Sequence, residues 1–259
     1  MARELSSISR FGLTEPFELQ VGRGQISGHS VVHVFGHNPD VDTTEVTIWP
    51  ATGLLGYPAS PTIMKISSSS TDDASAGTGA RTVYILGING TGGYVSETVT
   101  LNGQTEVNTV NSYTAIQQMS VASVGSGGKN AGVIYAGTGT VTAGVPAVAY
   151  SAMDVGDNLS LVGQWTCPAE HTGYLVHGSI TSGTTTANQY ITGRLKQRGL
   201  DGIVRTAAIT TLHYGTSEYD FSYPVKILAG ESISATADGS GNNNDVSSYF
   251  QIVLIRDSF

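Results

Sequence analysis

Short β-type segments, separated by turns rich in glycine, asparagine and serine, recur along most of this chain and constrain its fold more than any other feature. Residues 81–88, RTVYILGI, are typical, because β-branched and aromatic side chains favour strands. The Asn-Gly pair at 89–90 follows at once and favours a tight hairpin. Such segments return roughly every 10–15 residues, and no long Glu/Lys/Ala-rich segment is present from which to build helices. The chain is therefore predicted to be all-β, with antiparallel sheets.

The composition favours the same fold class. Hydrophobic residues make up 39% of the chain, enough for real cores, whereas charged residues make up only 12%. That charged share is about half of the roughly 25% that is usual in globular proteins. A surface solvated by hydroxyls and amides in place of charges suits β-sandwiches with many turns, and it is common in extracellular or particle-bound structural proteins.

The chain divides into three predicted regions. Residues 1–28 combine mixed charges with little periodicity, and they are expected to form an extended arm that lies against its own body or a neighbouring subunit. Residues 29–145 are predicted to form a β-sandwich domain, and residues 146–259 a jelly-roll-like β-sandwich domain of about eight strands. Residues 140–156, with Pro146 near their middle, are expected to connect the two domains.

Charge and hydropathy patterning exclude several function classes. A net charge of −8 argues against a general nucleic-acid binder, which needs a cationic face. No run approaches the ~18 apolar residues of a membrane span. The N-terminus has no apolar secretory core, so synthesis and folding are expected in the cytoplasm. The one cysteine, Cys167, excludes an internal disulfide and is expected to be a buried thiol.

The glycine-rich stretch GSGGKNAG at 125–132 raises the question of a phosphate-binding loop. A Walker A loop needs G-x-x-x-x-G-K-[ST] between a strand and a helix. Ser123 stands where the first glycine belongs, and Asn130 stands where Ser or Thr should bind magnesium. No helical pattern follows. The stretch is therefore predicted to be a turn between two β segments.

The titratable residues form no strong metal or catalytic motif. His29, His33 and His37 share one face of a predicted strand, where successive members lie about 13 Å apart and cannot close around one ion. The alternative that several subunits each contribute one histidine to a shared ring is not excluded by this spacing. Asp72 and Asp73 are adjacent and diverge in direction, so turn formation and solvation account for them. No Ser/His/Asp arrangement or G-x-S-x-G elbow stands out.

A partial calcium pattern occurs in DGSGNNND at 238–245, where oxygen donors alternate. Asn243 replaces the glycine that an EF-hand needs, and Tyr249 stands at the twelfth position, where a bidentate glutamate belongs. A flexible loop between two strands is the preferred interpretation. We expect no metal, no cofactor and no enzymatic activity.

Four of the twelve cationic residues gather in one predicted hairpin: Arg194, Lys196 and Arg198 alternate on a strand, and Arg205 follows. A solvated basic edge that blocks sheet-to-sheet aggregation is the preferred explanation. The alternative is that these side chains meet an acidic patch of another copy or of a partner protein.

Several segments resemble a known class of proteins. The first half, from SSSSTDDASAGTGARTVYILGINGTGGYVSETVTLNG to SVGSGGKNAGVIYA, lies within 67–136. In the second half, WTCPAEHTGYL at 165–175 leads to PVKILAGESI at 224–233 and to DVSSYFQIVLI at 245–255. Together they cover most of residues 60–255 and resemble structural proteins of tailed bacteriophages, especially phages of marine bacteria and cyanobacteria. The resemblance implies a component of the virion and supplies no catalytic residues.

The expected function is mechanical: a capsid cement or decoration protein that stabilises the shell through contacts between subunits. Its partners would be further copies of itself, as a homotrimer, and the major capsid protein or tail proteins of the same virion, with no nucleic acid and no membrane. The predicted interface residues are Phe11, Phe17, Trp49, Tyr57, Arg194, Lys196 and Arg198, with core membership as the alternative for Trp49.

The second hypothesis is a tail or baseplate component whose loops contact host glycans. Tyr190, Asn242 and Asn243 are the candidate sugar contacts, because an aromatic ring can stack on a sugar and amides can hydrogen-bond to it. A polysaccharide-degrading enzyme is the third class, and the sequence offers no carboxylate pair for it.

Overall fold

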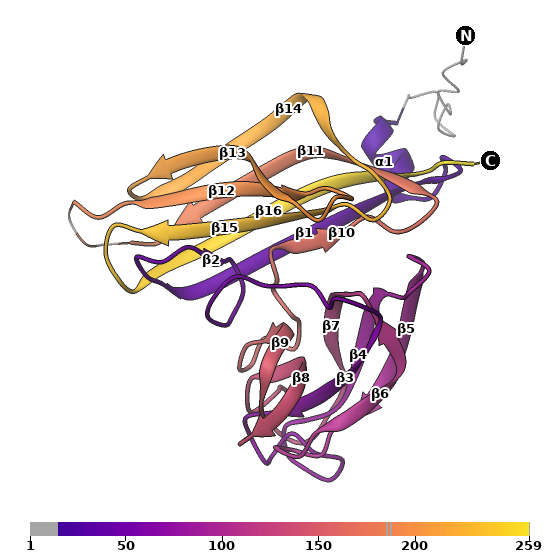
Figure 1. Ribbon diagram of the computed structural model, residues 1–259, viewed down its shortest axis with the longest axis vertical. Coiled ribbons are helices and arrows are strands. Elements are labelled where there is room, and N and C mark those ends of the chain that lie inside the picture. Colours follow the sequence, from indigo (N-terminus) through magenta and orange to yellow (C-terminus); the bar gives the residue numbers. More distant parts are fainter. Residues whose placement is uncertain (1–14, 185, 187, 259) are drawn as a thin grey trace.

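The computed structural model of this chain describes residues 15–184, 186 and 188–258 (Figure 1). Over these residues it contains one short helix and sixteen strands, and every strand pair is antiparallel. The prediction of a nearly all-β chain with antiparallel sheets is therefore confirmed. The strands form four sheets, which group into two domains.

One domain consists of two sheets from both ends of the chain. The first sheet has the order β1-β16-β11-β14, and the second has the order β10-β15-β12-β13, with β2 also beside β15. The bounds in the first sheet are β1 His29–Val41, β16 Asn244–Arg256, β11 His171–Ser182 and β14 Gly215–Ile227. The bounds in the second are β10 Gln164–Thr166, β15 Ser232–Gly239, β12 Ile191–Arg198, β13 Val204–Leu212 and β2 Val46–Thr47.

Both of these sheets contribute to one apolar core. Strict alternation along β16 buries Val246, Phe250, Ile252 and Leu254, while the intervening residues stay partly exposed. Side chains of the second sheet, among them Ile233 on β15, belong to the same buried cluster. The period of two therefore sets which face of each strand meets the other sheet.

The second domain is inserted into the first between β2 and β10, two short strands that together occupy one strand position beside β15. Thr47 of β2 pairs with Thr236, and Trp165 of β10 pairs with Ile233, so the two short strands lie end to end along β15. Between them, the Ile48 amide donates to the Ala235 carbonyl at 2.9 Å, and the Ala235 amide donates to the Gly163 carbonyl at 2.7 Å. The chain leaves the first domain after Ile48 and returns to the same place at Gly163.

The inserted domain has a four-stranded and a three-stranded sheet, with orders β6-β3-β8-β9 and β5-β4-β7. Buried residues of both sheets form its own core, including Ile85, Tyr113, Met119 and Ile134. The bounds are β3 Thr62–Ser68, β4 Ala80–Ile88, β5 Tyr94–Thr100, β6 Val107–Tyr113, β7 Ala115–Val124, β8 Ile134–Thr142 and β9 Val145–Met153.

The predicted domain boundaries differ from the observed ones. Residues 29–145 and 146–259 were expected to form separate domains, yet β1 pairs with β16 and β2 pairs with β15. Residues 140–156, predicted to be a connection, instead carry the end of β8 and all of β9. Pro146 lies in β9 at the margin of its sheet, a position where a missing amide hydrogen is tolerated.

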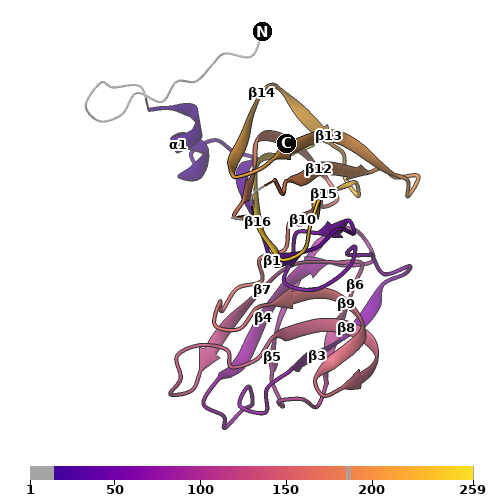
Figure 2. The same ribbon diagram turned by 90° about the vertical axis from the view of Figure 1, so that its left-hand side faces the viewer.

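The predicted N-terminal arm, residues 1–28, differs from the structure where it is described. Its first fourteen residues, and Phe11 with them, lie outside the described part of the chain. Residues Phe17–Gly22 form the helix α1, which lies beside β1 (Figure 2). The Phe17 ring meets the His29 ring edge to face, with centroids 6.1 Å apart.

The two domains meet through a small apolar cluster and through hydrogen bonds. Trp49, Leu55, Ala152 and Val162 are buried together at the junction. The Gln117 side chain on β7 exchanges two hydrogen bonds with the backbone of Thr166 on β10. These contacts fix the inserted domain against the β1 and β10 side of the first domain (Figure 2).

Candidate interaction surface

The margin of the first domain that carries β13 and β14 is the candidate interaction surface, and residues 200–228 are called the β13–β14 edge from here on. β13 is the last strand of one sheet and β14 is the last strand of the other, so each has a neighbour on one side only. The two strands follow one another in the chain around a turn at His213 and Tyr214. Two unpaired strand edges therefore lie at the same margin, where both can pair with another extended chain.

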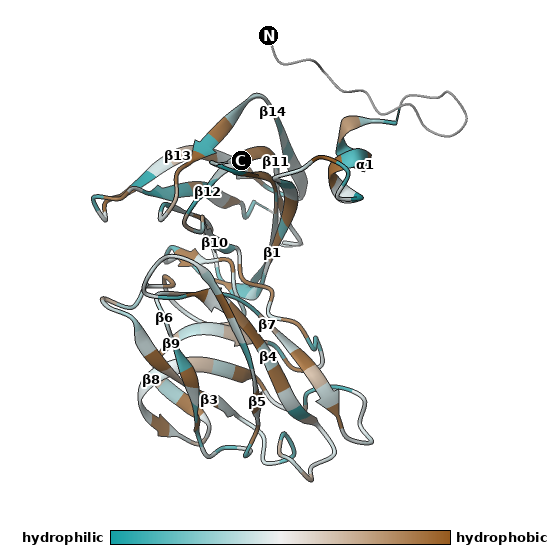
Figure 3. Cartoon of the chain, turned by 90° about the vertical axis from the view of Figure 1, so that its right-hand side faces the viewer, coloured by the Kyte–Doolittle hydropathy of each residue, from teal (hydrophilic) through white to brown (hydrophobic). Residues whose placement is uncertain are grey.

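Large apolar side chains gather on this edge. Of the 21 large hydrophobic residues exposed in the described chain, eight lie on the edge, a concentration far above its share of the length. Tyr223 is 92% exposed and Ile209 is 60% exposed. The others are Leu200, Ile203, Val204, Tyr214, Tyr219 and Leu228. Figure 3 shows apolar segments along β14 at the outer margin of the domain. A concentration of exposed apolar side chains on one part of the surface is typical of an interaction site.

A break in strand pairing exposes Tyr223. β14 pairs with β11 at Asp220↔His177 and next at Val225↔Leu175, so the residues between Asp220 and Val225 leave the register. The segment bulges away from the sheet, and Pro224, which has no amide hydrogen to donate, lies inside it. The bulge carries the Tyr223 ring outwards.

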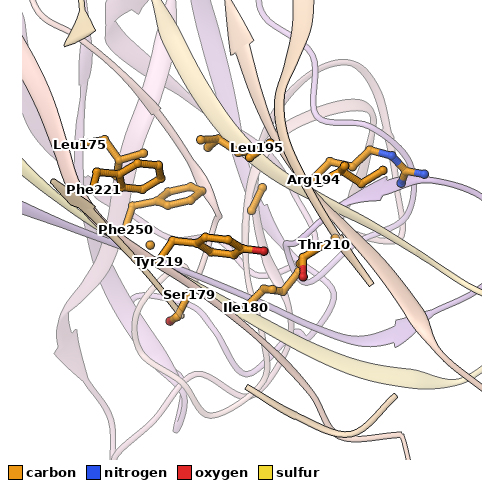
Figure 4. A pocket seen from close by; sticks show the side chains of 14 residues that line it. Leu175, Ser179, Ile180, Arg194, Leu195, Thr210, Tyr219, Phe221 and Phe250 are labelled. Atoms are coloured by element: carbon orange, nitrogen blue, oxygen red, sulfur yellow. The ribbon is translucent and has the colours of Figure 1, made fainter. Parts of the chain in front are cut away.

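A narrow cavity of about 50 Å³ opens between the two sheets behind this edge (Figure 4). Its walls are almost wholly apolar and include Leu175, Leu195, Phe221 and Phe250. The Tyr219 ring lies across it, with the hydroxyl directed towards Thr210. Hydrogen bonds from the Ser217 and Thr210 side chains lower the pKa of Tyr219. The inward faces of β13 and β14 are thus only partly covered by their own domain.

The basic residues predicted for an intermolecular contact have partners inside the chain. Arg194 forms an ion pair with Asp238, and Lys196 forms one with Glu45 at 2.9 Å. Burial alone would raise the pKa of Glu45, but hydrogen bonds from Thr236 and Lys196 outweigh it and lower that pKa. A contact of these cations with another subunit stays a prediction.

The predicted aromatic anchors occupy different environments. Trp49 is buried at the domain junction, so the alternative of core membership holds for it. Tyr57 lies beneath the Arg198 guanidinium, 4.7 Å from the ring centroid, and burial raises its pKa to about 12. Phe17 is half exposed on α1. Of these, Phe17 alone keeps a large free surface.

The three candidate sugar contacts lie close together at one end of the first domain. The Ser240 amide donates to the Tyr190 carbonyl at 2.8 Å, and the Tyr190 amide donates to the Ser240 hydroxyl at 2.9 Å. Asn242 and Asn243 follow in the same exposed turn. Asn243 has a left-handed backbone, with φ of 62°, and its amide donates to Asp42. The predicted loop between two strands is thus a turn that joins β15 in one sheet to β16 in the other.

The stretch GSGGKNAG lies between β7 and β8, as predicted for a turn, and its amides are used within the protein. The Gly125 and Gly127 amides donate to the Gly79 and Thr78 carbonyls. The Ala131 and Gly132 amides donate to the carboxylate of Asp73 at 2.8 and 2.9 Å. These four donors are not available to a phosphate.

Asp73 differs from the sequence-based interpretation. It was expected to be a solvated turn residue, but its side chain has no exposed surface. Its carboxylate accepts four hydrogen bonds, from the amides of Ala80, Ala131 and Gly132 and from the hydroxyl of Ser68. Buried charge of this kind is stable only when hydrogen-bonded. Asp73 holds together the loops that precede β4 and β8.

The histidines on β1 each have a separate partner. His29 contacts the Ser27 carbonyl, His33 the Tyr249 hydroxyl and His37 the Asp245 carboxylate. The part of the chain that the structure describes has no group of three or more His, Cys, Asp or Glu side chains suited to a metal ion. Cys167 is buried, and burial raises the pKa of its thiol to about 12.

Sequence reasoning missed the β13–β14 edge, although signals for it exist. Tyr219, Phe221 and Tyr223 alternate, a pattern that on a regular strand would direct three rings to one face. Pro224 follows them and marks an edge strand, because proline cannot donate to a central ladder. Exposure itself cannot be read from this pattern, since alternating aromatic residues usually face a core.

Comparisons with known proteins do not identify a family for this chain. No protein-family model and no curated protein matches this chain. Among solved structures, the VP2 subviral particle of infectious bursal disease virus aligns at 10% identity, covering 90% of this chain and 73% of that one, with a TM-score of 0.23. The Gt strain of the same virus aligns at 11%, covering 89% and 76%, with a TM-score of 0.20. Scores this low carry no argument about fold or function. None of the described helices is long and apolar enough to cross a membrane.

Proposed function

We propose that this chain is a non-enzymatic structural subunit of a bacteriophage virion, a cement or decoration protein of the capsid, whose copies associate through the β13–β14 edge. The observation that carries the proposal is that edge itself. It combines two unpaired strand edges, eight exposed large hydrophobic residues and an apolar opening between the sheets. A second copy supplies extended backbone for the free edges and apolar side chains for the opening.

The strand order of the first domain supports the proposal by analogy. We infer that both domains are β-sandwiches and that the first is a jelly roll of eight strands. Numbered by their order in the chain, with β2 and β10 as one position, those strands run 1-8-3-6 in one sheet and 2-7-4-5 in the other. Jelly rolls recur in viral capsid proteins and in lectins. Fold alone does not establish function, so the analogy adds to the argument from the surface without replacing it.

The assembly that we propose is a ring of copies joined through the two edges. Contact between β13 of one copy and β14 of the next is heterologous when β14 of the first copy contacts a third copy. Heterologous contacts are satisfied throughout only when the ring closes or the chain of copies continues without end. We propose closure at three copies, which suits a particle with local threefold axes.

Charge substitutions on the edge test self-association. The double variant Ile209→Asp, Tyr223→Asp is expected to sediment as a monomer under conditions in which the wild type sediments as a trimer. Val110→Asp is the matched control, because Val110 on β6 is also strongly exposed, at 87%, but lies on the inserted domain. A wild type that stays monomeric at high concentration would contradict self-association through this edge.

The virion assignment has its own test. Particles purified to homogeneity are expected to contain this chain in hundreds of copies, on the head, as seen by quantitative mass spectrometry and particle imaging. A copy number of a dozen or fewer would favour a tail component. Absence from finished particles would exclude the virion function while leaving the self-association result intact.

One observation favours the second candidate, a tail component with glycan-binding loops. Tyr190 is joined to the turn that carries Asn242 and Asn243 by two hydrogen bonds to Ser240, one from its amide and one to its hydroxyl, and all three candidate residues are exposed. Loss of glycan binding in the variant Tyr190→Ala, Asn243→Ala would support this function.

A further inference from the structure

A cleft of about 250 Å³ lies between the two domains, on the side away from β14. One wall is formed by β1, with His33 and Phe35. The other wall belongs to the inserted domain, with Leu86 on β4, Tyr94 on β5 and Gln118 on β7. Ligand sites occur preferentially at domain interfaces, where two surfaces form a concave wall that neither has alone.

Phe35 presents an aromatic face at this cleft. Its ring is half exposed and stacks on the Tyr249 ring behind it, with centroids 4.8 Å apart and planes inclined by 26°. Tyr249 is held in turn by a 2.7 Å hydrogen bond between its hydroxyl and Nδ1 of His33. The His33 ring lies almost parallel to the Tyr249 ring, at 10°. The exposed ring is thus rigidly backed, which reduces the entropy lost when a ligand binds to it.

Two other side chains that line the cleft carry hydrogen-bonding groups without a partner among the described residues. Nδ1 of His33 bonds to Tyr249, and Nε2 has no partner among the described residues. The Gln118 side-chain amide also makes no hydrogen bond in the described chain, whereas its neighbour Gln117 is occupied by Thr166. The Gln118 amide provides both donors and an acceptor. The cleft therefore combines one flat apolar surface with directional polar groups.

The lining contains no lysine, arginine, aspartate or glutamate. A phosphate, nucleotide or carboxylate ligand would lack a counter-charge here, and a cation would lack an anion. A sugar ring fits the remaining chemistry, because it has an apolar face of C–H groups and a rim of hydroxyls. We propose that the cleft between β1 and the β5-β4-β7 sheet binds a neutral saccharide, whose ring stacks on Phe35 and whose hydroxyls bond to His33 and Gln118.

This site is separate from the surfaces described above. β1 and β14 are opposite margins of the first sheet, so the cleft and the β13–β14 edge do not overlap. Tyr190 and the turn with Asn242 and Asn243 do not line the cleft. The proposal therefore goes beyond the structural function, and its result does not depend on the assembly state or on the virion location.

Binding of the full-length chain to an array of neutral mono- and oligosaccharides, followed by calorimetric titration of the best of them, tests the proposal. Phe35→Ala is expected to weaken that affinity at least tenfold, and Gln118→Ala severalfold, whereas Phe35→Tyr keeps the ring and retains binding. Tyr84→Ala is the matched control, because Tyr84 is an exposed aromatic on the same β4 as Leu86 but does not line the cleft.

Three outcomes would overturn the proposal. The first is that no neutral saccharide binds at concentrations up to about 10 mM, the weak end of specific recognition. The second is that binding survives Phe35→Ala. The third is that binding is lost in Tyr190→Ala but not in Phe35→Ala, which assigns the sugar to the loops of the first domain. Thermal unfolding of each variant verifies that the chain remains folded.

Discussion

The turn at 125–132 and the β13–β14 edge differ in how far their own domain satisfies their backbone and side-chain groups. The turn's amides reach carbonyls and the buried carboxylate of Asp73, so the turn is bonded to its own domain. The β13–β14 edge keeps two free strand margins and a row of uncovered apolar side chains. The difference teaches that the glycine-rich turn is closely packed against its own domain, whereas the uncovered apolar side chains lie on two strands that end their sheets.

The largest expected effect on stability comes from removing the carboxylate of Asp73, to which the turn at 125–132 is hydrogen-bonded. Asp73→Ala removes the acceptor for three amides, two of them buried, and for one buried hydroxyl at once. Leaving several buried donors unsatisfied should lower the free energy of unfolding by about 4 kcal/mol. Chemical denaturation followed by tryptophan fluorescence and circular dichroism measures the loss. Asp72→Ala, which alters the exposed neighbour, is expected to change stability by less than about 0.5 kcal/mol. Equal effects of the two variants would contradict the assigned role.

A smaller effect is expected at Glu97, which bonds β5 to β6. Burial would raise the pKa of Glu97, but hydrogen bonds from the amides of Val110 and Asn111 and from the Tyr113 hydroxyl outweigh it and lower that pKa. Because the folded-state pKa lies below the unfolded value, this contribution is present above the unfolded pKa of about 4.3 and is lost as pH falls through the folded-state pKa.

Glu97→Gln should therefore cost about 1 kcal/mol at neutral pH, a value reduced by the partial exposure of the carboxylate. The difference in unfolding free energy between wild type and variant should shrink as the pH is lowered below about 4. Denaturation curves at a series of pH values measure it. A difference that stays constant down to pH about 3 would show that the charge of Glu97 contributes nothing.

On the β13–β14 edge, by contrast, a substitution should leave the stability of a single subunit unchanged. Tyr223→Ser removes a ring that its own domain barely contacts, so the unfolding free energy of the dilute monomer is expected to shift by less than about 0.5 kcal/mol. Denaturation well below the association concentration makes this measurement. A loss of about 2 kcal/mol or more would mean that Tyr223 packs within the subunit, and the β13–β14 edge would lose its main anchor.

The smallest expected effect is chemical and concerns Cys167. Burial raises the pKa of this thiol to about 12, so almost no thiolate is present at neutral pH. Alkylation by iodoacetamide should therefore be negligible in the folded chain and complete after denaturation, as measured by mass spectrometry. Rapid labelling of the folded chain would indicate that the first domain opens locally around β10.

Features set by neighbouring residues could be predicted from the sequence. The segment 81–88 corresponds to β4, Ala80–Ile88, because its β-branched and aromatic residues and the turn after it act locally. Even here the turn chemistry differs in detail. Gly92, with φ of 82°, takes the left-handed position, and the Asn89 side chain caps the turn by accepting from the Thr91 and Gly93 amides.

Features set by distant residues could not be predicted. His29–Val41 pairs with Asn244–Arg256, more than 200 positions away, and nothing in either segment alone names its partner. The same reason explains Arg194 and Lys196, whose acidic partners, Asp238 and Glu45, come from opposite ends of the chain. The candidate surface escaped prediction because exposure depends on which strands end a sheet, and strand order is a global property.

The place where the inserted domain joins the first domain has a further consequence. Ile48 and Gly163 both bond to Ala235, and the apolar core of the first domain takes its residues from before position 49 and after position 164. A short peptide linker could span that gap, and so could an unrelated module of another size. Recombination at these two codons would thus exchange the inserted domain without removing any residue from the core of the first domain.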